Sequence, residues 1–167
     1  GKVLFDLYRE TGDQRYKAAM DILIRQLKNQ PRTLEGGFWH KLIYQHQMWL
    51  DGLYMASPFM AQYGAEFNKP EWIDEAVKQF RLCHKHTYDA KTGLYHHAWD
   101  ESTSQRWANP ETGHSPNFWG ASVGRWIMAL VDALDYIPEN HPGRADMIGY
   151  IRGLAETLPK YQDKAGL

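Results

Sequence analysis

Hydrophobic residues recur every three to four positions along most of the chain, which is the spacing of amphipathic helices. Pro58 is expected to bend one of these helices, and Pro70 occupies the first turn of the next, where proline is favoured. Alternation of apolar and polar residues, typical of a strand, is confined to residues 94–98. The pattern therefore predicts an all-α fold. The predicted helices cover residues 4–8, 16–27, 45–63, 70–83, 119–136 and 144–161.

A short phrase of glycine, aromatic residues and histidine follows two of the predicted amphipathic helices. It reads Gly36-Gly37-Phe38-Trp39-His40 in one place and Thr92-Gly93-Leu94-Tyr95-His96 in another, and residues 164–167 begin it again. The first two copies precede far more apolar helices, at residues 45–63 and 119–134. Helix pairs repeated in this way stack into a solenoid or close into a toroid. The apolar helices are expected to form its buried inner ring.

Composition and charge exclude several classes of function. Lys and Arg number 19 against 20 Asp and Glu, and no basic cluster occurs, so we expect neither a nucleic-acid nor a membrane partner. The single cysteine, Cys83, excludes an internal disulfide and a cysteine-rich zinc site. No HExxH motif, carboxylate cluster or glycine-rich phosphate loop is present, so we predict no metal and no cofactor. No secretory leader is visible, and cytoplasm and periplasm both remain open.

Aromatic residues and histidines are abundant. Aromatics make up 14% of the chain, with seven Trp and ten Tyr beside eight His. Such residues suit a pocket for a sugar, although they also suit an ordinary core. His40 and the pair His96-His97 lie in or next to the repeated phrase, so the repeat should place them at equivalent points on one rim. The alternative is that they are hydrogen-bonded loop residues without a role in a site.

Two charged residues stand alone in apolar surroundings. Asp51 is the only charged residue within positions 42–65, and Arg125 is the only one within positions 112–131. Burying an unpaired charge is costly, so each should be paired or should face a polar cavity. One interpretation is a structural ion pair of Asp51 with Arg125 or Lys41. The other is a pocket at the start of the inner helices, where apolar neighbours raise the pKa of Asp51 and suit it to general acid catalysis.

Several runs of residues together resemble the family-105 glycoside hydrolases, the unsaturated rhamnogalacturonyl hydrolases of bacteria. These enzymes are (α/α)6 six-hairpin toroids, and a complete toroid needs about twice this length. We therefore expect residues 1–167 to be part of a single toroidal catalytic domain, truncated at both ends. The runs that carry the resemblance are GGFWHK at 36–41, QMWLDGLYMA at 47–56, YHHAWD at 95–100 and FWG at 118–120.

The resemblance also assigns roles to individual residues. Asp51 matches the catalytic acid/base aspartate of the family, whose second pocket aspartate would lie upstream of Gly1. Ala121 stands where the family has arginine, and Arg125 lies one helical turn further along the same face, from which we expect it to reach a substrate carboxylate. The other residues that match the lining of the sugar cleft are His40, Lys41, His97 and Trp119.

The resemblance implies a pectin oligosaccharide, left by a lyase, as the substrate. Asp51 would protonate C4 of its 4,5-unsaturated uronic acid and then deprotonate the water that adds at C5, without the two carboxylates of ordinary glycoside hydrolysis. Trp39 and Trp119 would stack on sugar faces. Three alternatives remain: another toroidal sugar enzyme, such as an epimerase or a different unsaturated glucuronyl hydrolase; a carbohydrate-binding helical repeat without catalysis; or an inactive fragment. The oligomeric state stays open.

Overall fold

Helices dominate residues 1–165, the part of the chain that the computed structural model describes. The all-α prediction is confirmed, and Pro70 occupies the first turn of its helix as expected. Asp13 caps the second helix by accepting a hydrogen bond from the backbone N–H of Arg15. The third copy of the repeated phrase, at 164–167, lies partly outside the described residues. The helices are α1 (Val3–Thr11), α2 (Gln14–Lys28), α3 (Leu50–Glu66), α4 (Pro70–Thr87), α5 (Gly120–Leu134) and α6 (Arg144–Thr157), followed by a 3-10 turn at Leu158–Lys160.

One predicted helix, at residues 45–63, begins in the wrong place. Its first residues form strand β1 (Gln47–Trp49), which pairs antiparallel with β4 (Ala98–Asp100), and α3 starts only at Leu50. The backbone N–H of Leu50 donates to the carbonyl of His97 at 3.0 Å, which ties the start of α3 to the end of the other repeat. The error has a physical cause, because the partner strand is remote in sequence and local periodicity does not reveal it.

A second small sheet pairs β2 (Tyr88–Asp89) with β3 (Leu94–Tyr95) across a tight turn. Gly93 adopts φ +74° in this turn, a backbone conformation that favours glycine. The equivalent glycine of the first repeat, Gly37, serves a different purpose. A Cβ atom there would lie 2.2 Å from Sδ of Met48, so glycine is needed for close packing.

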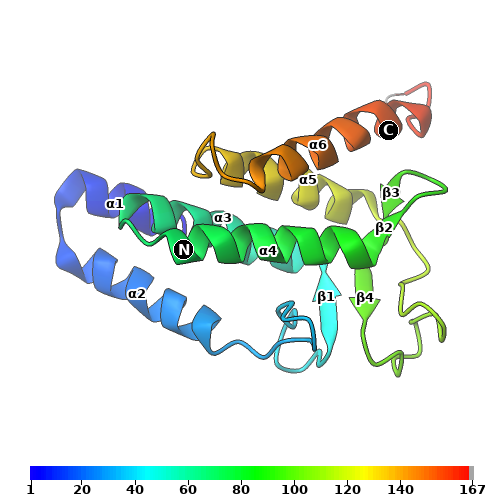
Figure 1. The fold of residues 1–167 in the computed structure, drawn as a ribbon, viewed down its shortest axis with the longest axis horizontal. Helices are drawn as coiled ribbons and strands as arrows, with labels where there is room; N and C mark the ends of the chain where they lie inside the picture. The colour runs from blue at the N-terminus through cyan, green and yellow to red at the C-terminus, as the bar shows by residue number, and fades with distance from the viewer. Residues whose placement is uncertain (166–167) are drawn as a thin grey trace.

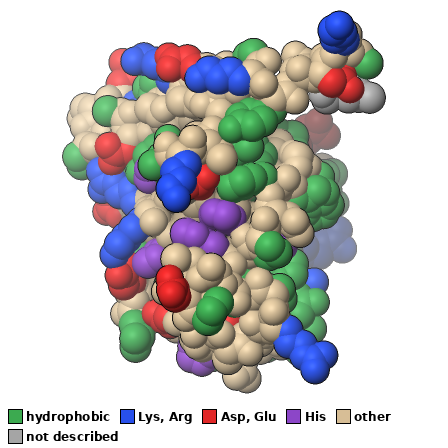
Figure 2. Space-filling model, turned by 90° about the vertical axis from the view of Figure 1, so that its right-hand side faces the viewer, with side chains coloured by type: hydrophobic (Ala, Val, Ile, Leu, Met, Phe, Trp, Pro, Cys, Tyr) green, Lys and Arg blue, Asp and Glu red, His purple; other side chains and the backbone are tan. Residues whose placement is uncertain are grey.

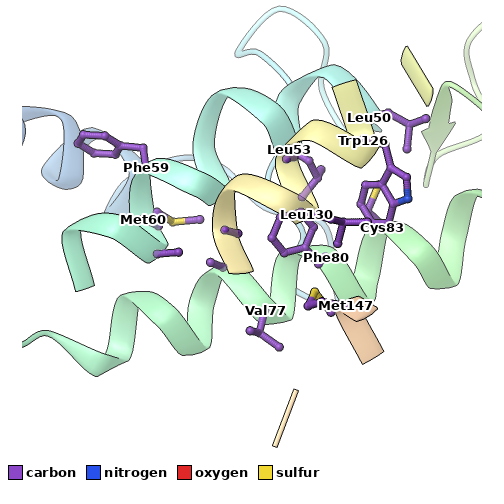
Figure 3. Packing of buried hydrophobic residues seen from close by; sticks show 14 of the residues in the cluster. Leu50, Leu53, Phe59, Met60, Val77, Phe80, Cys83, Trp126, Leu130 and Met147 are labelled. Atoms are coloured by element: carbon purple, nitrogen blue, oxygen red, sulfur yellow. The ribbon is translucent and has the colours of Figure 1, made fainter. Parts of the chain in front are cut away.

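The hydrophobic core lies between α3, α4 and α5, and α6 packs on α4 and α5 (Figure 1). Figure 3 shows Leu53 of α3, Phe80 of α4 and Leu130 of α5 converging in this core. Trp126 is fully buried there, with its ring centroid 5.6 Å from that of Phe80. Residues 57–64 of α3 are all buried, which agrees with the prediction of an inner helix.

Other apolar side chains on α3 and α5 remain at the surface. Met55 is 74% exposed on α3, and Met128 and Val131 are 47% and 48% exposed on α5. Within residues 1–165, no helix has the length and apolarity required to cross a membrane. The two small sheets and the loops next to them lie towards one end of the helices, on the right in Figure 1, and both α3 and α5 begin there. This end carries the candidate site.

Candidate active site

The centre of the site is a carboxylate held by two donors from a neighbouring helix. Asp51 lies in the first turn of α3, and its side chain is 14% exposed. The hydroxyl of Ser122, on α5, donates to Oδ2 of Asp51 at 2.5 Å, and the guanidinium of Arg125 donates to Oδ1. The predicted ion pair is thus confirmed with Arg125 as the partner of Asp51. Because α3 and α5 start at the same end, the two lone charges of the sequence meet.

The environment of Asp51 favours its ionised form. Burial by itself raises the pKa of the carboxyl group, but the hydrogen bonds from Ser122 and Arg125 and the positive charge of Arg125 lower it more. The pKa of Asp51 is therefore below its ordinary value. The expectation that apolar neighbours raise this pKa is wrong, because the donors come from positions 71 and 74 residues away.

A stack of parallel aromatic rings forms one wall of the site. The ring of Trp49 lies 4.6 Å from that of His40 and 5.0 Å from that of Tyr44, with interplanar angles of 5° and 8°. His97 approaches the same indole edge-on, with its ring centroid at 5.3 Å. His40 and His97, from the two repeats, therefore flank one tryptophan next to Asp51. His96, the repeat equivalent of His40, instead contacts the carbonyl oxygen of Ser115 through Nδ1 at 2.7 Å, as the loop-histidine alternative expects.

The two histidines are neutral at physiological pH. Burial and the charge of Lys41, only partly opposed by Asp51, together lower the pKa of His40 to about 4. Burial also lowers the pKa of His97. A neutral imidazole offers one donor and one acceptor nitrogen rather than a positive charge. These side chains can therefore bind sugar hydroxyl groups, while Arg125 supplies the cation beside Asp51.

The remaining predicted site residues lie around this centre. Trp119 precedes α5 and is 50% exposed; its ring lies 6.3 Å from that of His97 and 5.9 Å from the guanidinium carbon of Arg125. The Lys41 side chain is exposed, and its ammonium lies 5.6 Å from the ring centroid of Tyr44, at the edge of the stack. Figure 2 shows histidine side chains gathered in the middle of this face of the molecule.

Sequence reasoning misplaced one residue of the site and missed others. Trp39 does not lie in the stack: its ring packs against His46 at 4.7 Å, and its N–H is buried. The missed residues are Ser122, Tyr44 and Trp49. Only Ser122 carried a usable signal, because it precedes Arg125 by three residues and therefore shares its helical face.

Comparison with known proteins identifies the family. The family model described as Glycosyl Hydrolase Family 88 matches residues 1–167. The chain belongs to this family. A solved family-105 glycoside hydrolase from C. acetobutylicum ATCC 824 is 45% identical and superposes with a TM-score of 0.95, over 98% of this chain and 46% of that one. The predicted half of an (α/α) toroid and the resemblance to family 105 are thereby confirmed.

Two curated relatives extend the family comparison. Protein Atu3128 of Agrobacterium fabrum is 42% identical over 113 residues, which is 68% of this chain and 48% of that protein. The unsaturated rhamnogalacturonyl hydrolase YesR of Bacillus subtilis is 29% identical over 174 residues, covering 100% of this chain and 48% of YesR. The chain thus spans about half the length of these two curated relatives.

Proposed function

We propose that the protein containing this chain is an unsaturated rhamnogalacturonyl hydrolase. It would release the 4,5-unsaturated uronic acid from the non-reducing end of pectin oligosaccharides that a lyase has produced. One observation carries the proposal: a single carboxylate, Asp51, lies beside an arginine and a wall of aromatic rings and neutral histidines. The similarity to YesR supports the choice of substrate.

The reaction requires one carboxyl group in two protonation states. Protonated Asp51 transfers its proton to C4 of the enol ether, and the ring oxygen stabilises the positive charge that develops at C5. The Asp51 carboxylate then takes a proton from water as the water oxygen bonds to C5. The resulting hemiketal opens to a ketone at C5, and the hemiacetal at C1 releases the neighbouring sugar. One residue thus serves as acid and then as base.

The other side chains would bind and orient the substrate. The guanidinium of Arg125 matches a carboxylate in geometry and charge, so it would hold the uronate group. Trp119 and the Trp49 stack offer flat apolar faces for the sugar rings. His40 and His97 would exchange hydrogen bonds with hydroxyl groups. When the uronate pairs with Arg125, Asp51 loses part of the interaction that favours its anion, and this assists the protonation that the first step needs.

The test follows the loss of ultraviolet absorbance from an unsaturated galacturonyl-rhamnose disaccharide, in the full-length protein and two variants. Asp51→Asn should lower turnover by about three orders of magnitude or more and leave disaccharide binding within a few-fold of the parent. Asp132→Asn, which changes the same chemical group in an ion pair with Lys2, is the matched control and should retain activity. Near-normal turnover by Asp51→Asn contradicts the mechanism, and no turnover by the folded parent contradicts the substrate.

A further inference from the structure

A cavity of about 150 Å³ adjoins the ring stack of the candidate site. Leu27 at the end of α2, Leu53 on α3 and Gln79 on α4 contribute to its wall. His40 and Trp49 belong both to the stack and to this wall. The volume is sufficient for several water molecules.

Three residues that line this cavity carry a buried polar atom without a partner among the described residues. Nε1 of Trp39, Nδ1 of His40 and Oγ of Ser57 are buried and form no hydrogen bond within residues 1–165, and all three residues line it. Ser57 is fully buried. Leaving such an atom unsatisfied costs about 1–3 kcal/mol. Three such atoms around one cavity indicate a ligand that both accepts and donates hydrogen bonds, and water, with two to four hydrogen bonds per molecule, meets this requirement.

We propose that ordered water in this cavity links Trp39 and Ser57 to His40 and fixes the proton of the His40 imidazole on Nε2. The donors and acceptors that line the cavity allow this direction. The indole N–H of Trp39 can only donate, so a water that accepts from it directs its own two hydrogens elsewhere. Ser57 Oγ and His40 Nδ1 are the unpartnered atoms that can receive them. Nδ1 of His40 is then an acceptor, and the neutral ring carries its proton on Nε2.

The surrounding structure holds the three polar groups in place. The backbone of Trp39 is fixed at both sides, since its N–H donates to the carbonyl of Pro31 at 2.9 Å and its carbonyl accepts from Nε2 of Gln30 at 2.7 Å. The His40 ring is held by Trp49 at 4.6 Å. A Cβ atom at Gly52 would lie 2.9 Å from Nδ1 of His40, so glycine allows the ring to approach α3.

The consequence for the active site rests on the proposed function. With Nδ1 engaged behind the stack, the Nε2–H of His40 is free to donate to a hydroxyl or carboxylate oxygen of the sugar. Trp39 and Ser57 are then positioning residues, which act on the substrate only through His40.

The test measures the histidine ring ¹⁵N resonances of the full-length protein at pH 8.5, without substrate. His96 supplies an internal reference, because its Nδ1 lies 2.7 Å from the carbonyl oxygen of Ser115, which can only accept, so its proton is on Nδ1. We expect the opposite assignment for His40, with an unprotonated Nδ1. Trp39→Phe and Ser57→Ala should each shift the His40 resonances toward those of a tautomer mixture.

The matched control is Trp126→Phe, which removes another buried indole N–H without a partner, outside the cavity. It should leave the resonances of His40 unchanged. A proton on Nδ1 of His40 in the parent protein, or unchanged His40 resonances in the folded variants at positions 39 and 57, would overturn the proposal. A high-resolution crystal structure should show water within hydrogen-bond distance of all three atoms, and a dry cavity would also overturn it. Neither measurement needs substrate turnover, so a negative result would overturn this proposal without bearing on the proposed reaction.

Discussion

The two donors to Asp51, Ser122 and Arg125, should contribute unequally to the free energy of unfolding. Ser122 is fully buried, and a hydrogen bond to a charged group contributes about 1.5–3 kcal/mol. The side chain of Arg125 is 44% exposed, so solvent screens its charge, and such ion pairs contribute about 0.2–1 kcal/mol. We therefore expect Ser122→Ala to lower the free energy of unfolding by about 2 kcal/mol and Arg125→Met to lower it by less than about 1 kcal/mol.

The Arg125 contribution should depend on pH in a definite direction. Because the pKa of Asp51 is lower in the folded protein than its ordinary value of 3.8, the stabilisation is present above that value and is lost as the pH falls through the folded pKa. A double-mutant cycle of Asp51→Asn and Arg125→Met, measured by urea unfolding of the full-length protein, isolates the pair. His40 also reduces stability as the pH falls from 6.5 toward its pKa of about 4, but it is common to all four proteins and cancels.

Two results would refute this reasoning. A larger loss of stability from Arg125→Met than from Ser122→Ala would show that the exposed guanidinium is not screened as argued. A coupling energy between Asp51 and Arg125 that persists in acid, after Asp51 is protonated, would show that the coupling does not come from the charge of the carboxylate. Arg125→Lys is the matched control, since it keeps the charge but removes the planar guanidinium.

Two further substitutions test the geometry of the site. Gly52→Ala should displace the His40 ring, because Nδ1 of His40 would lie 2.9 Å from the new Cβ. We expect it to lower the free energy of unfolding by about 1–3 kcal/mol, measured by urea unfolding. It should also raise KM for the unsaturated disaccharide. Gly124→Ala is its control: the new methyl group meets nothing within 4 Å inside α5, so we expect a gain of about 0.5–1 kcal/mol, and a similar loss in both variants would contradict the packing argument. Trp119→Ala should raise KM severalfold with little change in kcat in steady-state kinetics, because a stacking face binds ground state and transition state alike; a fall in kcat alone would contradict this role.

Much of the fold was predictable because its helices are long and strongly amphipathic or strongly apolar. Pro70 marked the start of α4 correctly, and the repeated phrase identified the two loops that meet at the active site. The start of α3 was not predictable in this way. Met48 and Trp49 continue the apolar pattern of the helix that follows, and only the pairing of residues 47–49 with residues 98–100 makes them a strand.

The part of the site that could be predicted from the sequence is the pair of isolated charged residues. A lone Asp51 and a lone Arg125 in apolar segments need partners, and the structure pairs them with each other. The pKa direction was not predicted, because it depends on Ser122 as well as Arg125, and the only sign of Ser122 was its place on the helical face of Arg125. Trp49 was also missed as part of the site, since an aromatic residue beside a catalytic candidate is equally typical of a core.

In the proposed reaction, the position of Arg125 couples substrate binding to the protonation state of Asp51. The guanidinium of Arg125, on α5, donates directly to Asp51. In the proposed reaction the same guanidinium would bind the uronate carboxylate, so the substrate and Asp51 compete for one cation. When the substrate carboxylate pairs with Arg125, Ser122 remains as the side-chain donor to Asp51. The pKa of the Asp51 carboxyl group then rises. In the proposed reaction the arginine would thus favour the ionised form of Asp51 in the resting site. Once the substrate engages it, the arginine would assist the uptake of the proton that the first chemical step consumes.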